Sequence, residues 1–383
     1  MNTRAHSSHR RPWLVLFWAM VGFGVVAWSV LTLLAVTRAP YPVVALDVLG
    51  WFDQRMESIA QWPERSHRVL FIGDSLALDV RTKSVSVASR LQKRLATRTM
   101  LTRKSPIKVQ PVTISGFSLY SHYFVSDHLA SLKPDQVILA LNLMSFSKGW
   151  RSRERYQLSA FVSPHRWLEA LSLPLHEVGV TVDRLLFYQS IRAIGAFDAW
   201  WWLQREQART NRGYWRLAEW LQEWSGHPDG LAYRDDFTKI RFRRSMVRSG
   251  RATHRSARAL LGAALDGVEP NHAGLQVLDA LLDHLRQTSI PVVVYVPPIN
   301  VERLRALGLY NEQGLGLTLK RIRKVVRGHG ATFVDLHKVL GDAEFTDFMD
   351  HLAPDRAETS FGAVADLLSS HIHAPLTPPE AFK

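Results

Sequence analysis

The segment that decides the fold is RVLFIGDSLALDV, residues 68–80. The apolar run from Val69 to Ile72 ends at Gly73-Asp74-Ser75, and a stretch able to form a helix follows. A short apolar run closed by a glycine predicts a buried parallel strand that gives way to a tight turn. Ligands of open α/β sheets bind where the strands end. The sequence therefore places Ser75 at a strand end and a helix start, where its backbone N–H could stabilise an oxyanion.

Four further segments have the pattern of strands, and helical patterns separate them. The expected strands are residues 107–114, 136–143, 290–296 and 332–336, and the expected helices include 120–132, 315–329 and 357–368. Pro111 indicates that the second strand lies at an edge or breaks early, because proline cannot donate to a strand ladder. This alternation predicts repeated βαβ units and a parallel sheet.

At this point the chain resembles the GDSL or SGNH hydrolase superfamily, whose first block is a strand followed by Gly-Asp-Ser. The resemblance implies a flavodoxin-like, three-layer α/β fold with Ser75 as the nucleophile. It also implies an oxyanion hole made by the N–H groups of Ser75 and Gly116 with the side-chain amide of Asn142. The Gly-x-Asn-Asp motif that is usual in the superfamily is absent around Asn142, so capping at the strand end remains the alternative role for this residue.

The closing loop, residues 345–352, supplies the expected base. A neutral imidazole beside a serine can take its proton, and a carboxylate on the far ring nitrogen orients the imidazole. His351 fits this role and resembles the fifth block of the superfamily. That block has Asp three positions before His, where this chain has Phe348, so Asp347 and Asp350 both remain candidates for the carboxylate. Near the end of the fourth strand, Asn300 could contact substrate or cap a helix.

Composition and the N-terminus set the expected location. The chain has 383 residues, no cysteine and a formal net charge of +14, which favours an anionic partner. Residues 13–36 carry no charge and follow a basic tail; at about 1.5 Å per residue they could span the ~30 Å hydrocarbon core. We interpret them as an uncleaved signal anchor in the cytoplasmic membrane, with the rest of the chain extracytoplasmic by the positive-inside rule. Nucleic acid is then not an expected partner.

The strand and helix alternation stops over residues 148–271, which we expect to form a mainly helical insertion rich in tryptophan. It is either a subdomain with its own core or a lid or docking surface. Within it, residues 239–258 carry eight cations and no acidic residue. A solvated face is the ordinary meaning of such a run. The abundance of arginine favours contact with anionic headgroups or an anionic polymer, with Arg243 and Arg244 as candidate ligands.

An anchor followed by such a domain also resembles the partners of membrane-bound O-acyltransferases, such as alginate O-acetylation proteins and the D-alanyl-lipoteichoic acid transfer protein. We therefore expect a serine esterase or O-acyltransferase that acts on an envelope polymer, without cofactor or metal. The alternatives are a non-catalytic scaffold subunit and a lipid-acting esterase. The expected organisation is a basic tail (1–12), the anchor (13–36), a linker (37–67), the α/β domain (68–147 and 272–372) split by the insertion (148–271), and a tail (373–383).

Overall fold

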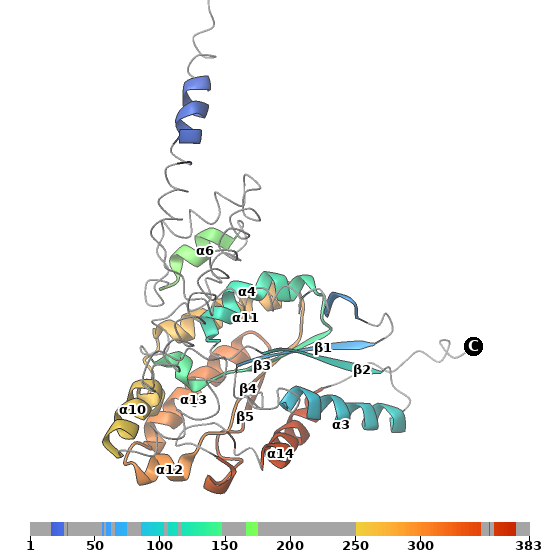
Figure 1. Ribbon diagram of the computed structural model, residues 1–383, viewed down its shortest axis with the longest axis vertical. Coiled ribbons are helices and arrows are strands. Elements are labelled where there is room, and N and C mark those ends of the chain that lie inside the picture. The colour runs from blue at the N-terminus through green and yellow to red at the C-terminus, as the bar shows by residue number, and fades with distance from the viewer. Residues whose placement is uncertain are drawn as a thin grey trace, which may run out of the picture.

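The computed structural model describes residues 17–26, 29, 56, 59–62, 66–74, 86–102, 106–113, 117–147, 166–174, 250–345, 352 and 356–372. Its centre is a five-stranded parallel sheet with the order β2-β1-β3-β4-β5 (Figure 1). The strands are β1 (His67–Gly73), β2 (Ile107–Thr113), β3 (Gln136–Ala140), β4 (Val292–Val296) and β5 (Thr332–Asp335). This order is that of flavodoxin-like folds. The parallel α/β sheet expected from the sequence is confirmed.

The first strand is buried on both faces and paired on both sides. Ile72 of β1 lies opposite Val112 of β2 and Leu139 of β3. Pro111 falls in β2, which is an edge strand of the sheet and tolerates the missing N–H. The prediction of an edge position is therefore confirmed.

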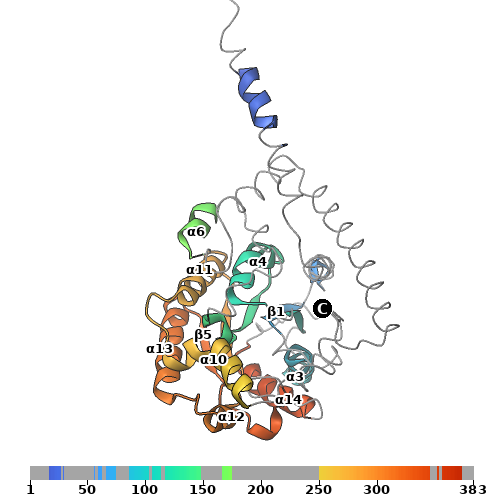
Figure 2. The same cartoon turned by 60° about the vertical axis from the view of Figure 1, so that its left-hand side comes forward.

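Helices cover both faces of the sheet and complete three layers (Figures 1 and 2). Because successive side chains of a strand point to opposite faces, Phe71 packs under one layer and Ile72 under the other. The first layer contains α3 (Val87–Thr102) and α14 (Ala357–Ser369). The second contains α4 (Leu119–Ser131), α10 (Gly250–Asp266), α11 (Ala273–Gln287), α12 (Val301–Ala306) and α13 (Glu312–Gly328). Shorter elements are η2 (Leu143–Phe146), α6 (Trp167–Ser172) and η6 (Asp342–Glu344).

The described ends of the expected insertion pack on the α/β domain. In α10 the apolar residues Ala257, Leu261, Ala264 and Leu265 are fully buried in the same core cluster as α11 and α13. These residues follow the spacing of one helical face, and the exposed Arg258 lies between the first two of them. The structure thus packs one face of α10 into the core of the α/β domain, within residues 148–271 that were expected to form the insertion because the strand and helix alternation stops there. Residues 175–249, with Arg243 and Arg244, lie outside the described residues.

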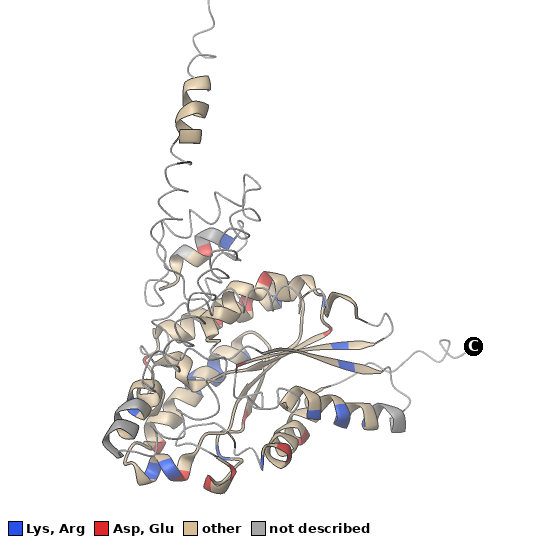
Figure 3. Cartoon of the chain, viewed as in Figure 1, with Lys and Arg blue, Asp and Glu red and all other residues tan. Residues whose placement is uncertain are grey.

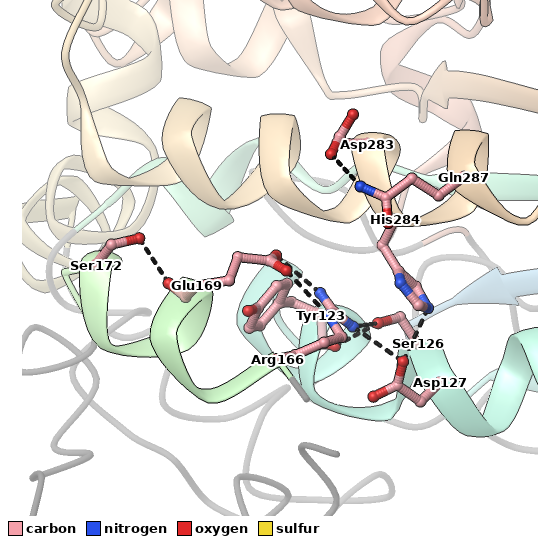
Figure 4. Close-up of polar contacts among 9 residues, drawn as sticks. All are labelled: Tyr123, Ser126, Asp127, Arg166, Glu169, Ser172, Asp283, His284 and Gln287. Carbon is pink, nitrogen blue, oxygen red and sulfur yellow. Dashed lines mark hydrogen bonds and ion pairs between the residues drawn. The ribbon is translucent and has the colours of Figure 1, made fainter. Parts of the chain in front are cut away.

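A buried arginine ties the start of the insertion to α4 (Figure 4). The Arg166 side chain is 4% exposed, and its guanidinium carbon lies 4.5 Å from the centre of the Tyr123 ring. Its Nη1 donates to Ser126 Oγ at 2.5 Å, and its Nη2 lies 3.0 Å from a carboxylate oxygen of Glu169. Asp127 lies 3.4 Å from Nη1 of the same guanidinium. The clustered acceptors balance a charge that would be costly to bury alone.

Of the expected anchor, the structure describes residues 17–26 and 29, which are helical. Phe17, Trp18 and Phe23 are all more than half exposed. No helix within the described residues is both long enough and apolar enough to cross a membrane.

Two glycines of α13 provide a matched test of the packing between α10 and α13. A Cβ at Gly314 would overlap the Leu265 carbonyl oxygen and lie 2.7 Å from the Asp266 carbonyl carbon, whereas a Cβ at Gly316 meets nothing within 4 Å. Gly314→Ala should lower the free energy of unfolding by about 1–3 kcal/mol through overpacking. Gly316→Ala should raise it by about 0.5–1 kcal/mol because alanine favours the helix.

Urea unfolding of the two variants beside the parent chain measures both effects. Equal destabilisation by the two alanines would show that α10 and α13 are not packed as closely as described.

Candidate functional site

The candidate site begins where β1 and β3 end side by side. The strand order reverses here, because β1 leads to β2 on one side and β3 lies on the other. Asp74 follows the last residue of β1, and Asn142 lies two residues beyond β3. Asn142 Nδ2 donates a hydrogen bond of 2.5 Å to Asp74 Oδ2, and both side chains are buried. The pair therefore joins two strand ends at the position where open α/β sheets bind ligands.

The amide of Asn142 is held from both ends. Its Oδ1 accepts a 2.9 Å hydrogen bond from the N–H of Met144, in the first turn of η2. Only one orientation of the amide satisfies both neighbours, because the carboxylate of Asp74 accepts and the N–H of Met144 donates. The cap expected as one alternative is thus present. An amide nitrogen carries two hydrogens, so one N–H of Asn142 remains for another acceptor.

Tyr295 of β4 adds a third buried polar group beside this pair. Burial, together with the negative charge of Asp74, raises the pKa of the Tyr295 phenol above its ordinary value. Burial thus keeps the phenol of Tyr295 neutral at physiological pH.

The other expected catalytic residues lie outside the described residues, but their neighbours are placed. These residues are Ser75, Gly116, Asp347, Asp350 and His351. Ser75 directly follows the buried Asp74. The segment 346–351 is closed at its base by an antiparallel bridge between Phe345 and Leu352. Both ends of the loop that carries His351 are therefore fixed.

Two side-chain contacts hold the base of this loop. Ser360 Oγ of α14 donates to Glu344 Oε2 at 2.6 Å. Asn300 Nδ2 donates to Asp342 Oδ1 at 2.8 Å, while Asn300 Oδ1 caps α12 by accepting from the N–H of Arg303. Asn300 is 1% exposed, and the cap expected as one alternative is present. Its contact with substrate stays a prediction.

The start of α4 lies just after Gly116 and contains a residue that the sequence analysis did not single out. Ser118 and Ser121 form a capping box, and the N–H of Leu119 donates to Ser145 Oγ at 3.2 Å, which links α4 to η2. His122 follows in the first turn, 3% exposed, with its ring against Phe117. Burial lowers the pKa of His122 to about 3. Histidines in amphipathic helices are common, and nothing in the sequence marks this one as buried.

No group of three metal-ligating side chains occurs within the part of the chain that the structure describes.

No family model matches the chain, and no curated protein matches it. Among solved structures, an acetyl xylan esterase is 13% identical with a TM-score of 0.39, covering 80% of this chain and 99% of its own. A GDSL-like lipase from Parabacteroides merdae is 10% identical with a TM-score of 0.37, covering 80% and 97%. A lipase/acylhydrolase from Enterococcus faecalis is 10% identical with a TM-score of 0.35, covering 81% and 100%. Likeness at this level does not extend to activity.

The burial of His122 predicts a pH-dependent stability. The native imidazole has a pKa of about 3, below the value of 6.5 for an exposed histidine, so only the unfolded chain binds the proton between these values. Stability is thus greatest above pH 6.5 and falls, by up to ~1.4 kcal/mol per pH unit, as the pH decreases toward 3. The variant His122→Phe should lose this part of the pH dependence of the free energy of unfolding. Urea unfolding at several pH values between about 3 and 6.5 measures it. His254→Gln, at an exposed position of α10, should leave it in place.

The contact between Asp74 and Asn142 predicts a reciprocal rescue. Asn142→Asp places two carboxylates in contact in a buried site and should lower the free energy of unfolding by about 3 kcal/mol or more at pH 8. The deficit should shrink at pH 5, where one of the two carboxyls takes up a proton.

The double variant Asp74→Asn/Asn142→Asp exchanges donor and acceptor and should recover most of the loss. A double variant no more stable than Asn142→Asp alone would contradict the assigned hydrogen bond.

Proposed function

We propose that this protein is a membrane-anchored serine esterase or O-acyltransferase that acts on acyl esters of a cell-envelope polysaccharide or other anionic polymer. The observation that carries this proposal is the buried hydrogen bond between Asp74 and Asn142 beside Ser75. It joins Asn142 to the residue that directly precedes Ser75 in the chain. An amide that is held in place, and whose second N–H has no acceptor among the described residues, is suited to stabilising an oxyanion formed at Ser75.

In the proposed reaction, His351 accepts the proton of Ser75 Oγ while that oxygen attacks the acyl carbonyl carbon. The carbonyl oxygen becomes an oxyanion, which receives hydrogen bonds from the N–H groups of Ser75 and Gly116 and from the remaining Asn142 N–H. Collapse of this intermediate expels the alcohol, which takes the proton from His351. Water or a polymer hydroxyl then attacks the acyl-enzyme, and His351 again moves the proton. Asp347 or Asp350 orients the imidazole.

Preorganisation supports this assignment. An oxyanion donor contributes most when it need not reorient during the reaction. Asn142 is held by Asp74 at one end and by Met144 at the other. The loop expected to bring His351 to the same edge is fixed at Phe345 and Leu352.

The proposed location rests on the N-terminal segment. The exposed apolar side chains of Phe17, Trp18 and Phe23 suit a lipid environment, and the preceding basic tail suits the cytoplasmic face. In that setting a membrane-bound O-acyltransferase is a suitable partner. A scaffold subunit is the alternative if Ser75 is not activated, and a lipid-acting esterase is the alternative if the insertion faces the membrane.

Labelling with a fluorophosphonate tests the nucleophile without knowledge of the substrate. The full chain should be labelled at Ser75, and both Ser75→Ala and His351→Ala should lose labelling, by about a thousandfold or more. In-gel fluorescence with peptide mapping measures the site and the extent of the reaction.

Thermal unfolding of each variant shows whether the fold survives. If folded parent protein is not labelled while a known serine esterase in the same tube is, the esterase assignment fails and the scaffold role takes its place.

A further inference from the structure

Three polar residues follow β3, and the reaction proposed above uses only Asn142. The other two, Ser145 and Ser147, lie in or directly after the turn η2, and both are at most 2% exposed. A hydroxyl that is removed from water needs a hydrogen-bond partner in the fold. Ser145 Oγ accepts from the N–H of Leu119 at 3.2 Å, whereas Ser147 Oγ has no partner within the part of the chain that the structure describes. Two buried serines of one turn thus differ in a single hydrogen bond.

The partner of Ser145 lies at the start of α4. Leu119 is the first residue of this helix, and an N–H in the first turn has no acceptor inside the helix. The capping box serves two neighbouring groups, because the N–H of Ser121 donates to Ser118 Oγ and the N–H of Ser118 donates to Ser121 Oγ. The N–H of Leu119 instead donates to a residue 26 positions away in the chain. Ser145 therefore ties the start of α4 to the end of β3.

This tie connects the two sides of the proposed oxyanion site. The N–H of Ser145 donates to the carbonyl oxygen of Asn142 at 3.0 Å, so the hydroxyl and the amide belong to one hydrogen-bonded turn. On the other side, Leu119 lies three positions after Gly116, and both residues between them are buried. The spacing between the Asn142 amide and the segment that follows Gly116 consequently depends on Ser145.

The core holds η2 in place from behind. Phe146 of this turn is fully buried, and its ring centre lies 5.7 Å from that of His272, the N-cap of α11. A Cβ at Gly274 would lie only 2.8 Å from Phe146 Cδ1. A turn packed this closely cannot shift without moving α11. Ser145 therefore presents its hydroxyl from a fixed position.

Uncharged groups make this link, which separates it from the ion pairs of the outer helices. Figure 3 shows basic α3 beside acidic α14, and Arg90 pairs there with Glu358. Neither a serine hydroxyl nor a backbone N–H changes its protonation at ordinary pH. An effect of Ser145 on the reaction should thus be the same at every pH, unlike an effect that acts through His351.

We propose that Ser145 is a positioning residue, which holds the start of α4 on η2 so that the Gly116 N–H and the Asn142 amide reach the same oxyanion. The proposal rests on the proposed function, because it explains how the donors of that site keep their spacing. The oxyanion exists only in the transition state and the intermediate. Loss of the spacing should therefore slow turnover and leave binding of the ester unchanged.

Turnover of p-nitrophenyl acetate by the full chain tests this role. Ser145→Ala should lower kcat by about tenfold to a hundredfold, with KM within about twofold of the parent and the same loss at every pH measured. The matched control Ser147→Ala removes the same atom from the same turn without breaking a hydrogen bond, and should keep kcat within about twofold. Ser145→Cys fills the site with a weak acceptor and should lose less than Ser145→Ala.

A double-mutant cycle with Asn142→Ala separates positioning from general loss of stability. When the Asn142 amide is absent, the spacing has lost one of its ends, so Ser145→Ala should cost less than it does in the parent. Losses that multiply would overturn the positioning role, as would equal losses in Ser145→Ala and Ser147→Ala. A loss of kcat no larger than the unfolded fraction, measured by thermal unfolding, would overturn it too. If Ser145→Ala does not fold, the comparison of Ser145→Cys with Ser147→Ala decides in the same way.

The two proposals fail in different ways. A folded parent chain that neither turns over the ester nor reacts with the fluorophosphonate would end the esterase assignment, and the role of Ser145 with it. An active parent whose kcat is unchanged by Ser145→Ala would overturn the role of Ser145 alone.

Discussion

Backbone hydrogen bonds connect β1 to β2 on one side and to β3 on the other, and its side chains are buried on both faces. The register of this strand is strongly specified. A shift by one residue would turn every side chain to the opposite face of the sheet, against the other layer of helices. Phe71 fixes the layer of α3 and α14, and Ile72 fixes the layer of α4 and α11. The carboxyl end of β1 is consequently held in place by both neighbouring strands.

That constraint explains how a polar pair is tolerated in the core. Asp74 and Asn142 lie where two parallel strands end together, and each satisfies part of the other's hydrogen-bonding capacity. The same linkage continues through Met144 and Ser145 into η2 and the start of α4. The oxyanion geometry proposed for this edge would thus be set by the sheet and not by mobile side chains, which is the condition for electrostatic preorganisation.

Charge is distributed unequally over the two helical layers. On the layer of α3 and α14, arginines and acids pair across two helices, at the exposed surface where each pair contributes little to stability. On α13, Lys320, Lys324 and Arg327 are exposed, whereas Arg321 and Arg323 are half-buried. The buried charge of Arg166 is compensated locally, because Ser126, Glu169 and the Tyr123 ring surround the guanidinium.

The sequence by itself determined the five strands, their parallel direction and the edge position of β2. Buried strands are recognisable as short local runs of apolar residues, and a proline, which cannot donate a ladder hydrogen bond, favours an edge strand. The resemblance to the SGNH superfamily, carried by the Gly-Asp-Ser segment, also singled out Asn142. Only the tertiary structure decided that Asn142 contacts Asp74, since that hydrogen bond joins residues far apart in the chain and depends on strand order. Packing likewise decided that α10 joins the core, that His122 is buried and that Asn300 caps a helix. Burial depends on which surfaces meet in the folded chain, and a local sequence pattern does not show this.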